Sequence, residues 1–388
     1  MKLAILKERR AHETRVAATP DTVKRLAALG LEIAVEAGAG AEASIADAAY
    51  AAAGAEVAPD AAGCLAGADI LFKVARPMGA LDGRDELAGL KPGAVLVGML
   101  DPYRNREQLE DYARRRIAAV AMELVPRISR AQAMDVLSSQ ANLAGYKAVL
   151  DAAHEFGRAL PMMMTAAGTI APAKVLVMGA GVAGLQAIAT ARRLGAVVSA
   201  TDVRLVAKEQ VESLGAKFVM VDDDEAKQAE TSGGYAKEMS DAYKAKQAAL
   251  IADEIRKQDI VICTALIPGR AAPRLVTAEM IASMKPGSVI VDLAVENGGN
   301  CALSEYGKVV EVGGVRIVGH ANVPGRVAVD ASMLYSRNLF AFAQLIVKDG
   351  ALGLDREDEI VKGALLTFDG AVVHPAFAPA SGSAPTTI

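Results

Sequence analysis

The amino-acid sequence predicts an α/β protein of two domains, each built on a doubly wound parallel sheet, with a cleft between the domains. Three observations predict this class. The chain has 388 residues, enough for two or three domains of roughly 100–200 residues. Short apolar segments alternate with segments of helical period over most of the length, which is typical of a parallel sheet with crossover helices. Motifs of the first half also recur in the second.

In the first half, we expect strands at residues 3–6, 32–35, 70–74, 94–98 and 118–121, with helices between them such as 20–29 and 106–115. Residues 129–160 have helical spacing and predict one long helix that bridges the halves. A second run of strands is expected at 174–178, 197–201, 218–221, 260–264, 289–293 and 316–318. The segment 332–347 predicts a helix that packs back on the first half, and the tail 379–388 is expected to be disordered.

An internal repeat links the two runs. Lys91-Pro92-Gly93 precedes an apolar strand in the first half, as Lys285-Pro286-Gly287 does in the second. Further upstream, residues 69–72 match residues 259–262. The repeat indicates two related halves of nucleotide-binding type, although such turns can also recur by chance.

Composition excludes several classes of protein. The formal net charge is -4 and the sequence pI is about 5.8, so no basic excess exists to neutralise the phosphates of a nucleic acid. No apolar run reaches the roughly 18–20 residues that a membrane span needs. The three cysteines form no close pair, which is typical of reduced thiols and not of a disulfide framework or a zinc site. Only four histidines occur, so a histidine-rich metal or acid/base centre is not expected.

A glycine motif carries the clearest chemistry. Gly179-Ala180-Gly181-Val182-Ala183-Gly184 follows an expected strand and opens an expected helix, and Asp202 ends the next strand. This context is typical of a Rossmann-like dinucleotide site, in which the turn approaches a pyrophosphate at the helix N-terminus. Asp202 is expected to accept hydrogen bonds from the adenine ribose and to favour NAD over NADP, with Arg204 nearby as a complication.

Other segments are ambiguous from their residues alone. Ser129 and Gln132 fit a capping box, with Asp135 early in a helix; alternatively Arg127, Gln132 and Asp135 face the cleft and hold a nicotinamide. The polar stretch 222–243 is either a solvated loop or a lid with Tyr235 at its tip. Lys73 and Arg15 are possible carboxylate binders, His320 could line the cleft, Cys263 is expected to be an inert buried thiol, and residues 162–164, all methionine, are expected in core or hinge packing.

The sequence also resembles a known family. Lys7-Glu8 followed by residues 13–20, Glu-Thr-Arg-Val-Ala-Ala-Thr-Pro, resembles the opening signature of alanine dehydrogenases and nicotinamide nucleotide transhydrogenases. The glycine motif, Pro268-Gly269 and residues 292–300 agree with both branches. Residues 127–135, 138–142, 162–169 and 233–235 resemble the transhydrogenase branch, most closely its NAD(H)-binding alpha subunits. The likeness covers residues 1–375.

The resemblance implies NAD(H) as the cofactor, with NADP(H) held on a partner subunit. The residues implied at the catalytic site are Arg127, Gln132, Asp135 and Tyr235, the last on a mobile loop. Those implied at the cofactor are Ser138, Gly179, Gly181, Val182, Ala183, Gly184, Asp202, Val203, Arg204, Gly234, Thr264, Ala265 and Leu266. It further implies a homodimer, partners that comprise a membrane-spanning proton-channel subunit and the NADP(H)-binding subunit, and a cytoplasmic place at the face of the inner membrane through those partners.

The alternative activity is that of an alanine dehydrogenase. Oxidative deamination needs a positioned acid/base group and an anchor for a carboxylate. Alanine dehydrogenases carry a histidine just after the fourth strand of the first half, where this chain has Gly98-Met99-Leu100. Hydride transfer between two nicotinamides needs orientation and close approach instead. We therefore expect a transhydrogenase with one domain at 1–140 plus 325–388 and an NAD(H)-binding domain at 141–324.

Overall fold

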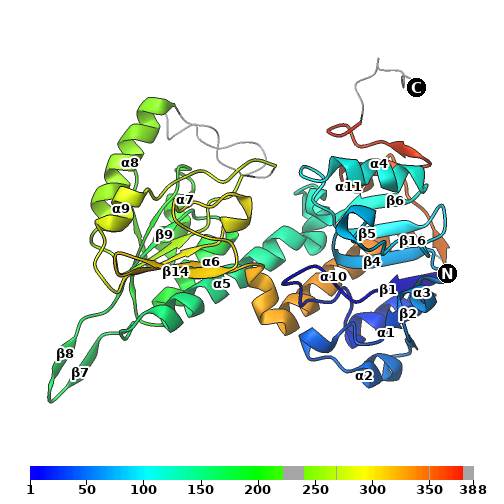
Figure 1. Cartoon of the computed structure of the whole chain (residues 1–388), viewed down its shortest axis with the longest axis horizontal. Helices are drawn as coiled ribbons and strands as arrows, with labels where there is room; N and C mark the ends of the chain where they lie inside the picture. Colours follow the sequence, from blue (N-terminus) through cyan, green and yellow to red (C-terminus); the bar gives the residue numbers. More distant parts are fainter. Residues whose placement is uncertain (222–239, 268, 349, 379–388) are drawn as a thin grey trace. The chain divides into compact units, whose positions relative to one another are not determined.

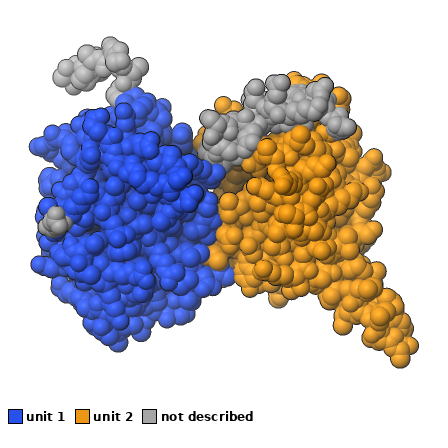
Figure 2. Space-filling model, turned by 180° about the vertical axis from the view of Figure 1, so that it is seen from behind, with its two compact units in different colours: residues 1–140, 327–388 blue, residues 141–326 orange. Residues whose placement is uncertain are grey.

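The computed structural model describes residues 1–221, 240–267, 269–348 and 350–378. The chain divides into two compact units, shown in blue and orange in Figure 2. Unit 1 consists of residues 1–140 and 327–388, and unit 2 of residues 141–326.

Unit 1 contains a six-stranded parallel sheet of order β3-β2-β1-β4-β5-β6 (Figure 1). Its strands are β1 (Lys2–Ile5), β2 (Glu32–Glu36), β3 (Glu56–Ala58), β4 (Ile70–Ala75), β5 (Val95–Met99) and β6 (Ala118–Ala121). Its helices are α1 (Pro20–Ala28), α2 (Asp47–Ala52), α3 (Ala61–Leu65), α4 (Arg106–Arg114), α10 (Ala328–Ile346) and α11 (Glu359–Ala364). Side chains on the central strands are almost fully buried, because helices cover both faces of a sheet of this kind.

Helix α10 belongs to the core of unit 1, as the sequence predicts. Tyr335, Leu339 and Phe342 are fully buried in one apolar cluster with the strands of this sheet. The Tyr335 hydroxyl also donates a hydrogen bond of 2.9 Å to the Lys73 carbonyl oxygen in β4. The chain therefore returns from unit 2 to complete the layer that the first 140 residues leave open.

Unit 2 has a seven-stranded sheet of order β11-β10-β9-β12-β13-β15-β14. Its strands are β9 (Lys174–Met178), β10 (Val197–Thr201), β11 (Lys217–Phe218), β12 (Ile260–Cys263), β13 (Val289–Asp292), β14 (Lys308–Val312) and β15 (Val315–Gly319), and β14 alone of these runs antiparallel, against β15. The helices are α6 (Val182–Arg193), α7 (Ala207–Ser213), α8 (Asp241–Ile255), α9 (Ala278–Ala282) and most of α5 (Val136–Glu155). The parallel, doubly wound α/β class is thus confirmed. No helix in the described parts of the chain is long and apolar enough to cross a membrane.

The two sheets share one design, which confirms the internal repeat. β3-β2-β1-β4-β5-β6 and β11-β10-β9-β12-β13-β15 have the same order of strands in space. The repeat extends to side chains at the amino edge of each sheet. Asp69 accepts hydrogen bonds from the Lys2 amide (2.8 Å) and the Lys91 ammonium (2.6 Å). The matching carboxylate of unit 2 is bound in the same way by the matching groups, as its three residues are Asp259, Lys174 and Lys285.

The long helix predicted over residues 129–160 is wrong in its extent. Residues Ser129–Met134 form a 3-10 helix, and α5 begins only at Val136. Asp135 separates the two, because its carboxylate accepts hydrogen bonds from the Ser138 amide (2.8 Å) and hydroxyl (2.6 Å) at the start of α5. A side chain that caps the amide three residues later marks the start of a new helix.

The predicted packing role of Met162, Met163 and Met164 is also wrong. These residues lead into a hairpin of β7 (Met163–Thr165) and β8 (Gly168–Ile170), which stands out from unit 2 in Figure 1. The three methionines are 59%, 45% and 76% exposed. Sequence reasoning assigned apolar side chains to the interior, whereas this pair of strands has no third strand or helix to cover it.

Candidate functional site

The glycine motif forms a tight turn between β9 and α6, and two of its glycines are required by geometry. Gly179 has φ +100, which disfavours any residue with a side chain. A Cβ atom at Gly184 would lie 1.8 Å from the Gly179 carbonyl oxygen. The Thr264 hydroxyl, at the end of β12, donates a hydrogen bond of 2.9 Å to the same oxygen. The turn is thus held from two sides at the carboxyl edge of the sheet, where open α/β sheets bind ligands.

The middle glycine, Gly181, faces open space. Its φ of -79 suits any residue, and no described atom lies within 4 Å of a Cβ built on it. Gly181 is the N-cap of α6, and no side chain caps that helix. The first backbone amides of a helix have no partner within the helix, so this end can bind an anion. An open cradle over uncapped amides fits the pyrophosphate of a dinucleotide.

Asp202 lies at the end of β10, beside the turn, and is more engaged than the sequence predicts. One carboxylate oxygen accepts the Ala180 amide (2.7 Å) and the Arg204 Nη2 (2.9 Å). The other accepts the Arg204 amide (2.8 Å) and Nε (2.9 Å). A carboxylate has about four acceptor positions, so all are in use. A ribose could bind Asp202 only after the Arg204 side chain gives up its two bonds.

The remaining residues of this set lie around the same edge of unit 2. Val182 and Ala183 form the first turn of α6, and Val203 packs against the buried Tyr243 of α8. Ala265 and Leu266 follow Thr264, and the Leu266 side chain is 43% exposed. Gly234 and Tyr235, predicted at the cofactor and on a lid, lie outside the described residues. The structure therefore gathers at one sheet edge the predicted cofactor residues of unit 2 that it describes.

A second set of predicted residues lies in unit 1. Arg127 and Gln132 are exposed, and Asp135 and Ser138 are bonded to each other as described above. The expected capping box is not formed, since the 3-10 helix starts at Ser129 itself and no side chain caps it. The structural explanation for Gln132 is therefore wrong, and its side chain points outward with no cap to make. Nearby, the buried Asn338 of α10 holds this segment by a hydrogen bond of 2.8 Å to the Ala133 carbonyl oxygen.

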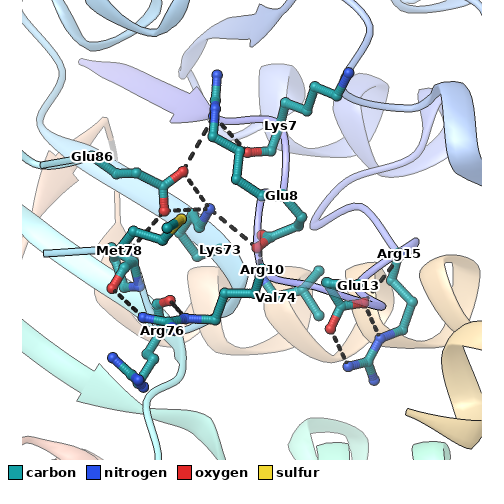
Figure 3. A network of polar contacts seen from close by, with 12 residues as sticks. Lys7, Glu8, Arg10, Glu13, Arg15, Lys73, Val74, Arg76, Met78 and Glu86 are labelled. Atoms are coloured by element: carbon teal, nitrogen blue, oxygen red, sulfur yellow. Dashed lines mark hydrogen bonds and ion pairs between the residues drawn. The ribbon is translucent and has the colours of Figure 1, made fainter. Parts of the chain in front are cut away.

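The place in unit 1 that corresponds to the glycine turn is filled by the chain's own charges (Figure 3). The registers of β1 and β9 make Lys7 equivalent to Gly179 and Arg9 equivalent to Gly181. The Arg9 guanidinium forms ion pairs with Glu36 and, at 3.2 Å, with Glu86. An arginine side chain with two carboxylates thus occupies the space that Gly181 leaves open in unit 2. Unit 1 has the fold of a nucleotide-binding half without its cradle.

The neighbouring cations of unit 1 are paired as well. Lys73 is fully buried, with its ammonium 3.1 Å from Glu8 and 3.4 Å from Glu86. Burial raises the pKa of the Glu8 carboxyl, although Lys73 opposes that shift. Arg15 is 6% exposed and binds Glu13 at 2.6 Å and Gln140 at 2.9 Å. A substrate carboxylate could bind Lys73 or Arg15 only by displacing these internal partners.

The cysteine and histidine predictions concern less reactive groups. Cys263 is fully buried, and burial raises the pKa of its thiol well above the usual value, which agrees with an inert thiol. His320 follows β15 in unit 2, and burial followed by the charge of Arg326 lowers the pKa of its imidazole. Neither group is placed to act on the glycine turn by any contact described in the structure.

Sequence reasoning missed two buried polar residues at this edge. Asp292 ends β13 and accepts hydrogen bonds from the Ala294, Asn300 and Cys301 amides. The Asn300 side chain in turn binds both backbone polar groups of Ala265. Their signal was present in the sequence, as an aspartate that ends a strand and an asparagine after two glycines, but the segment was read only for its resemblance.

Comparison with known proteins agrees with this geometry. Residues 4–144 match the N-terminal domain, and residues 148–375 the C-terminal domain, of the family "Alanine dehydrogenase/PNT". The chain is 61% identical over 378 residues to an NAD(P) transhydrogenase alpha subunit from Rhodospirillum rubrum, and the match covers 97% of this chain and 98% of that one.

Two solved structures lie at different distances. A transhydrogenase from Sinorhizobium meliloti superposes with a TM-score of 0.87 at 57% identity, over 96% of this chain and 100% of that one. An L-alanine dehydrogenase superposes with a TM-score of 0.80 at 27% identity, over 97% and 98%. The chain therefore belongs to the alanine dehydrogenase/PNT family, and within it to the branch of the NAD(P) transhydrogenase alpha subunits.

Proposed function

We propose that this chain is the NAD(H)-binding subunit of a proton-translocating transhydrogenase. It would hold NADH while a separate subunit holds NADP⁺, and the reaction would be coupled to proton movement through a membrane-spanning subunit. The observation that carries the proposal is the glycine turn of unit 2, with Gly181 open above the uncapped start of α6 and Asp202 beside it. Membership of the transhydrogenase branch supports the choice of reaction.

The residues of this chain would act by binding and orientation. When bound, NADH supplies a hydride, whose transfer to a second nicotinamide needs no acid or base at the carbon. The amides at the start of α6 would hold the pyrophosphate, and Asp202 the adenine ribose. We propose that Arg127, Gln132 and Asp135 hold the nicotinamide end, so that close approach of the two rings lowers the barrier.

An alanine dehydrogenase is less well supported. The segment after β5, Gly98-Met99-Leu100, offers no histidine. The possible carboxylate binders Arg15 and Lys73 are engaged by Glu13, Glu8 and Glu86. Unit 1 would therefore need internal rearrangement before it could bind a small carboxylate and exchange a proton with it.

The deciding experiment is reconstitution with the membrane and NADP(H)-binding subunits of a bacterial transhydrogenase. We expect NADH binding by the chain alone, little turnover alone, and hydride transfer between the two nucleotides in the complex. Oxidation of NADH by the isolated chain that depends on pyruvate and ammonia would establish alanine dehydrogenase instead. NADH binding with no transfer in the complete complex would indicate a regulatory NAD-binding protein.

Asp202→Ala is expected to change cofactor preference. The substitution removes the acceptor of two Arg204 side-chain bonds, and the released guanidinium can pair with a 2′-phosphate. We expect the affinity for NADPH to rise about tenfold, or roughly 1.4 kcal/mol, and that for NADH to fall. Isothermal titration of both nucleotides measures this change. The double variant D202A/R204A should bind NADPH no better than the unmodified chain; if it gains as much as D202A, Arg204 has no part in the preference.

We further propose that the chain is a homodimer whose subunits meet at the β7–β8 hairpin. A two-stranded hairpin is marginally stable alone in water, and Met162, Met163, Met164 and Ile170 are 42–76% exposed on this one. A second copy of the hairpin has matching apolar surface. Through the membrane partner, the dimer would stand at the cytoplasmic face of the inner membrane.

Met164→Lys is expected to convert the dimer to a monomer. The charge would be buried without a partner in the joined hairpins, which is costly. Sedimentation velocity at micromolar concentrations measures the result. Val197→Lys, which alters a side chain 52% exposed at the start of β10, is the control and should leave the dimer intact. A wild-type chain that sediments as a monomer would refute this proposal.

A further inference from the structure

We infer that Asn300 is a positioning residue that sets the backbone of Ala265 and Leu266 for the nicotinamide half of the cofactor. The inference rests on the proposed function and concerns the loop after β12. Asn300 is fully buried. Its side chain accepts a hydrogen bond from the Ala265 amide (3.0 Å) and donates to the carbonyl oxygens of Ala265 (2.9 Å) and Pro273 (2.8 Å). One amide group thus binds both polar groups of a single backbone residue.

The other side of the loop is tied to the glycine turn. Thr264, next to Ala265, donates its hydroxyl hydrogen bond to Gly179 at 2.9 Å. Ala265 is therefore held between Asn300 on one side and the turn on the other. Leu266 comes next in the chain, with 43% of its side chain exposed. A shift of Ala265 would move Leu266 relative to the turn, since the peptide bond that joins them is rigid.

Asn300 is itself held in place by Asp292. The Asp292 carboxylate is 1% exposed and accepts the amides of Asn300 (3.2 Å) and Cys301 (3.0 Å) and the Ser304 hydroxyl (2.6 Å). Gly299 precedes Asn300 with φ +81, and a Cβ there would lie 2.7 Å from an Asp292 carboxylate oxygen. The aspartate and the glycine therefore fix the direction in which the Asn300 side chain points.

Two of the backbone carbonyls bound by Asn300 explain why an amide is needed. The side chain must offer one acceptor, to the Ala265 amide, and two donors, to the oxygens of Ala265 and Pro273. Asparagine supplies both kinds of group, whereas aspartate of the same shape supplies acceptors alone. A carboxylate at this position would face two carbonyl oxygens without water, and the loop would move away from it.

The place of the loop predicts which part of the nucleotide depends on Asn300. In a doubly wound sheet the dinucleotide crosses the point where the strand order reverses, here between β9 and β12. Asp202, on β10, lies on the adenosine side, and the loop after β12 lies on the other. Asn300 therefore acts on the nicotinamide half and leaves the adenosine half unaffected.

The test compares NADH with 5′-AMP, which contains the adenosine half alone. For Asn300→Asp we expect the Kd of NADH to rise at least tenfold and the Kd of 5′-AMP to change less than twofold, both measured by titration calorimetry. Asn300→Ala, which adds no buried charge, is the second variant if Asn300→Asp does not fold, and it should show the same selective loss. Thermal unfolding of each variant records any general loss of stability.

Gln258→Glu is the matched control. Gln258 is also a buried amide of unit 2, 3% exposed, and lies just before the opposite end of β12 with its amide bonded to Glu254. This variant should lose stability while keeping the ratio of the two Kd values. Equal losses of NADH and 5′-AMP in both Asn300 variants, or no loss in either, would overturn the role of Asn300. Failure of the unmodified chain to bind NADH would instead refute the proposed function.

Discussion

Gly181→Ala is expected to weaken NADH binding at least tenfold while leaving the folded chain intact. The added methyl group meets no described atom within 4 Å, and the φ of -79 suits alanine. The same methyl group would fill the space through which a pyrophosphate approaches the amides of α6. A tenfold loss corresponds to roughly 1.4 kcal/mol. Titration with NADH and thermal unfolding of the same preparation measure the two quantities separately.

Two other glycine variants frame this result. Gly184→Ala places its methyl group 1.8 Å from the Gly179 carbonyl oxygen, so we expect a loss of folding free energy of about 1–3 kcal/mol or more from overpacking. Gly157→Ala, just beyond α5, has no atom within 4 Å and should change neither quantity. If Gly181→Ala binds NADH as tightly as Gly157→Ala does, the open space at the turn is not the pyrophosphate site.

Gln132→Asn is expected to slow hydride transfer at least tenfold in the reconstituted complex and to change the Kd of NADH less than threefold. The side chain is exposed on its 3-10 helix and forms no cap, so shortening it by one methylene removes no described internal bond. A group whose purpose is to orient two nicotinamides affects the rate through misplacement, because productive geometry tolerates little error. Single-turnover kinetics gives the rate, and titration gives the affinity.

The control for this variant is Gln247→Asn on α8, another shortened amide, in unit 2. It should leave both the rate and the affinity unchanged. Equal losses of rate and of NADH affinity in Gln132→Asn would assign Gln132 to binding alone. An unchanged rate would remove Gln132 from the transfer step and leave Arg127 and Asp135 to be tested in the same way.

Local patterns predicted the parts of the fold that depend on few neighbours. Apolar strands, the Lys91 and Lys285 turns and the glycine motif were each visible because their geometry is determined within about ten residues. The wrong parts were those in which two local explanations competed. Ser129 and Gln132 fit a capping box in sequence, but Asp135 caps the next helix and the box is not formed. Met162 to Met164 are apolar, and only the absence of a covering layer leaves them exposed.

Sequence by itself determined that the chain has two related α/β halves and a glycine turn shaped for a dinucleotide, because periodicity and glycine geometry are local properties. Tertiary structure decided which half has an open cradle. Arg9 of unit 1 meets Glu36 and Glu86 across 27 and 77 residues of chain, whereas the space at Gly181 stays open. It also placed Asn300 against Ala265, 35 residues away. Such pairings arise only when strands far apart in sequence are brought to one sheet edge, since hydrogen bonds and ion pairs depend on distance in space.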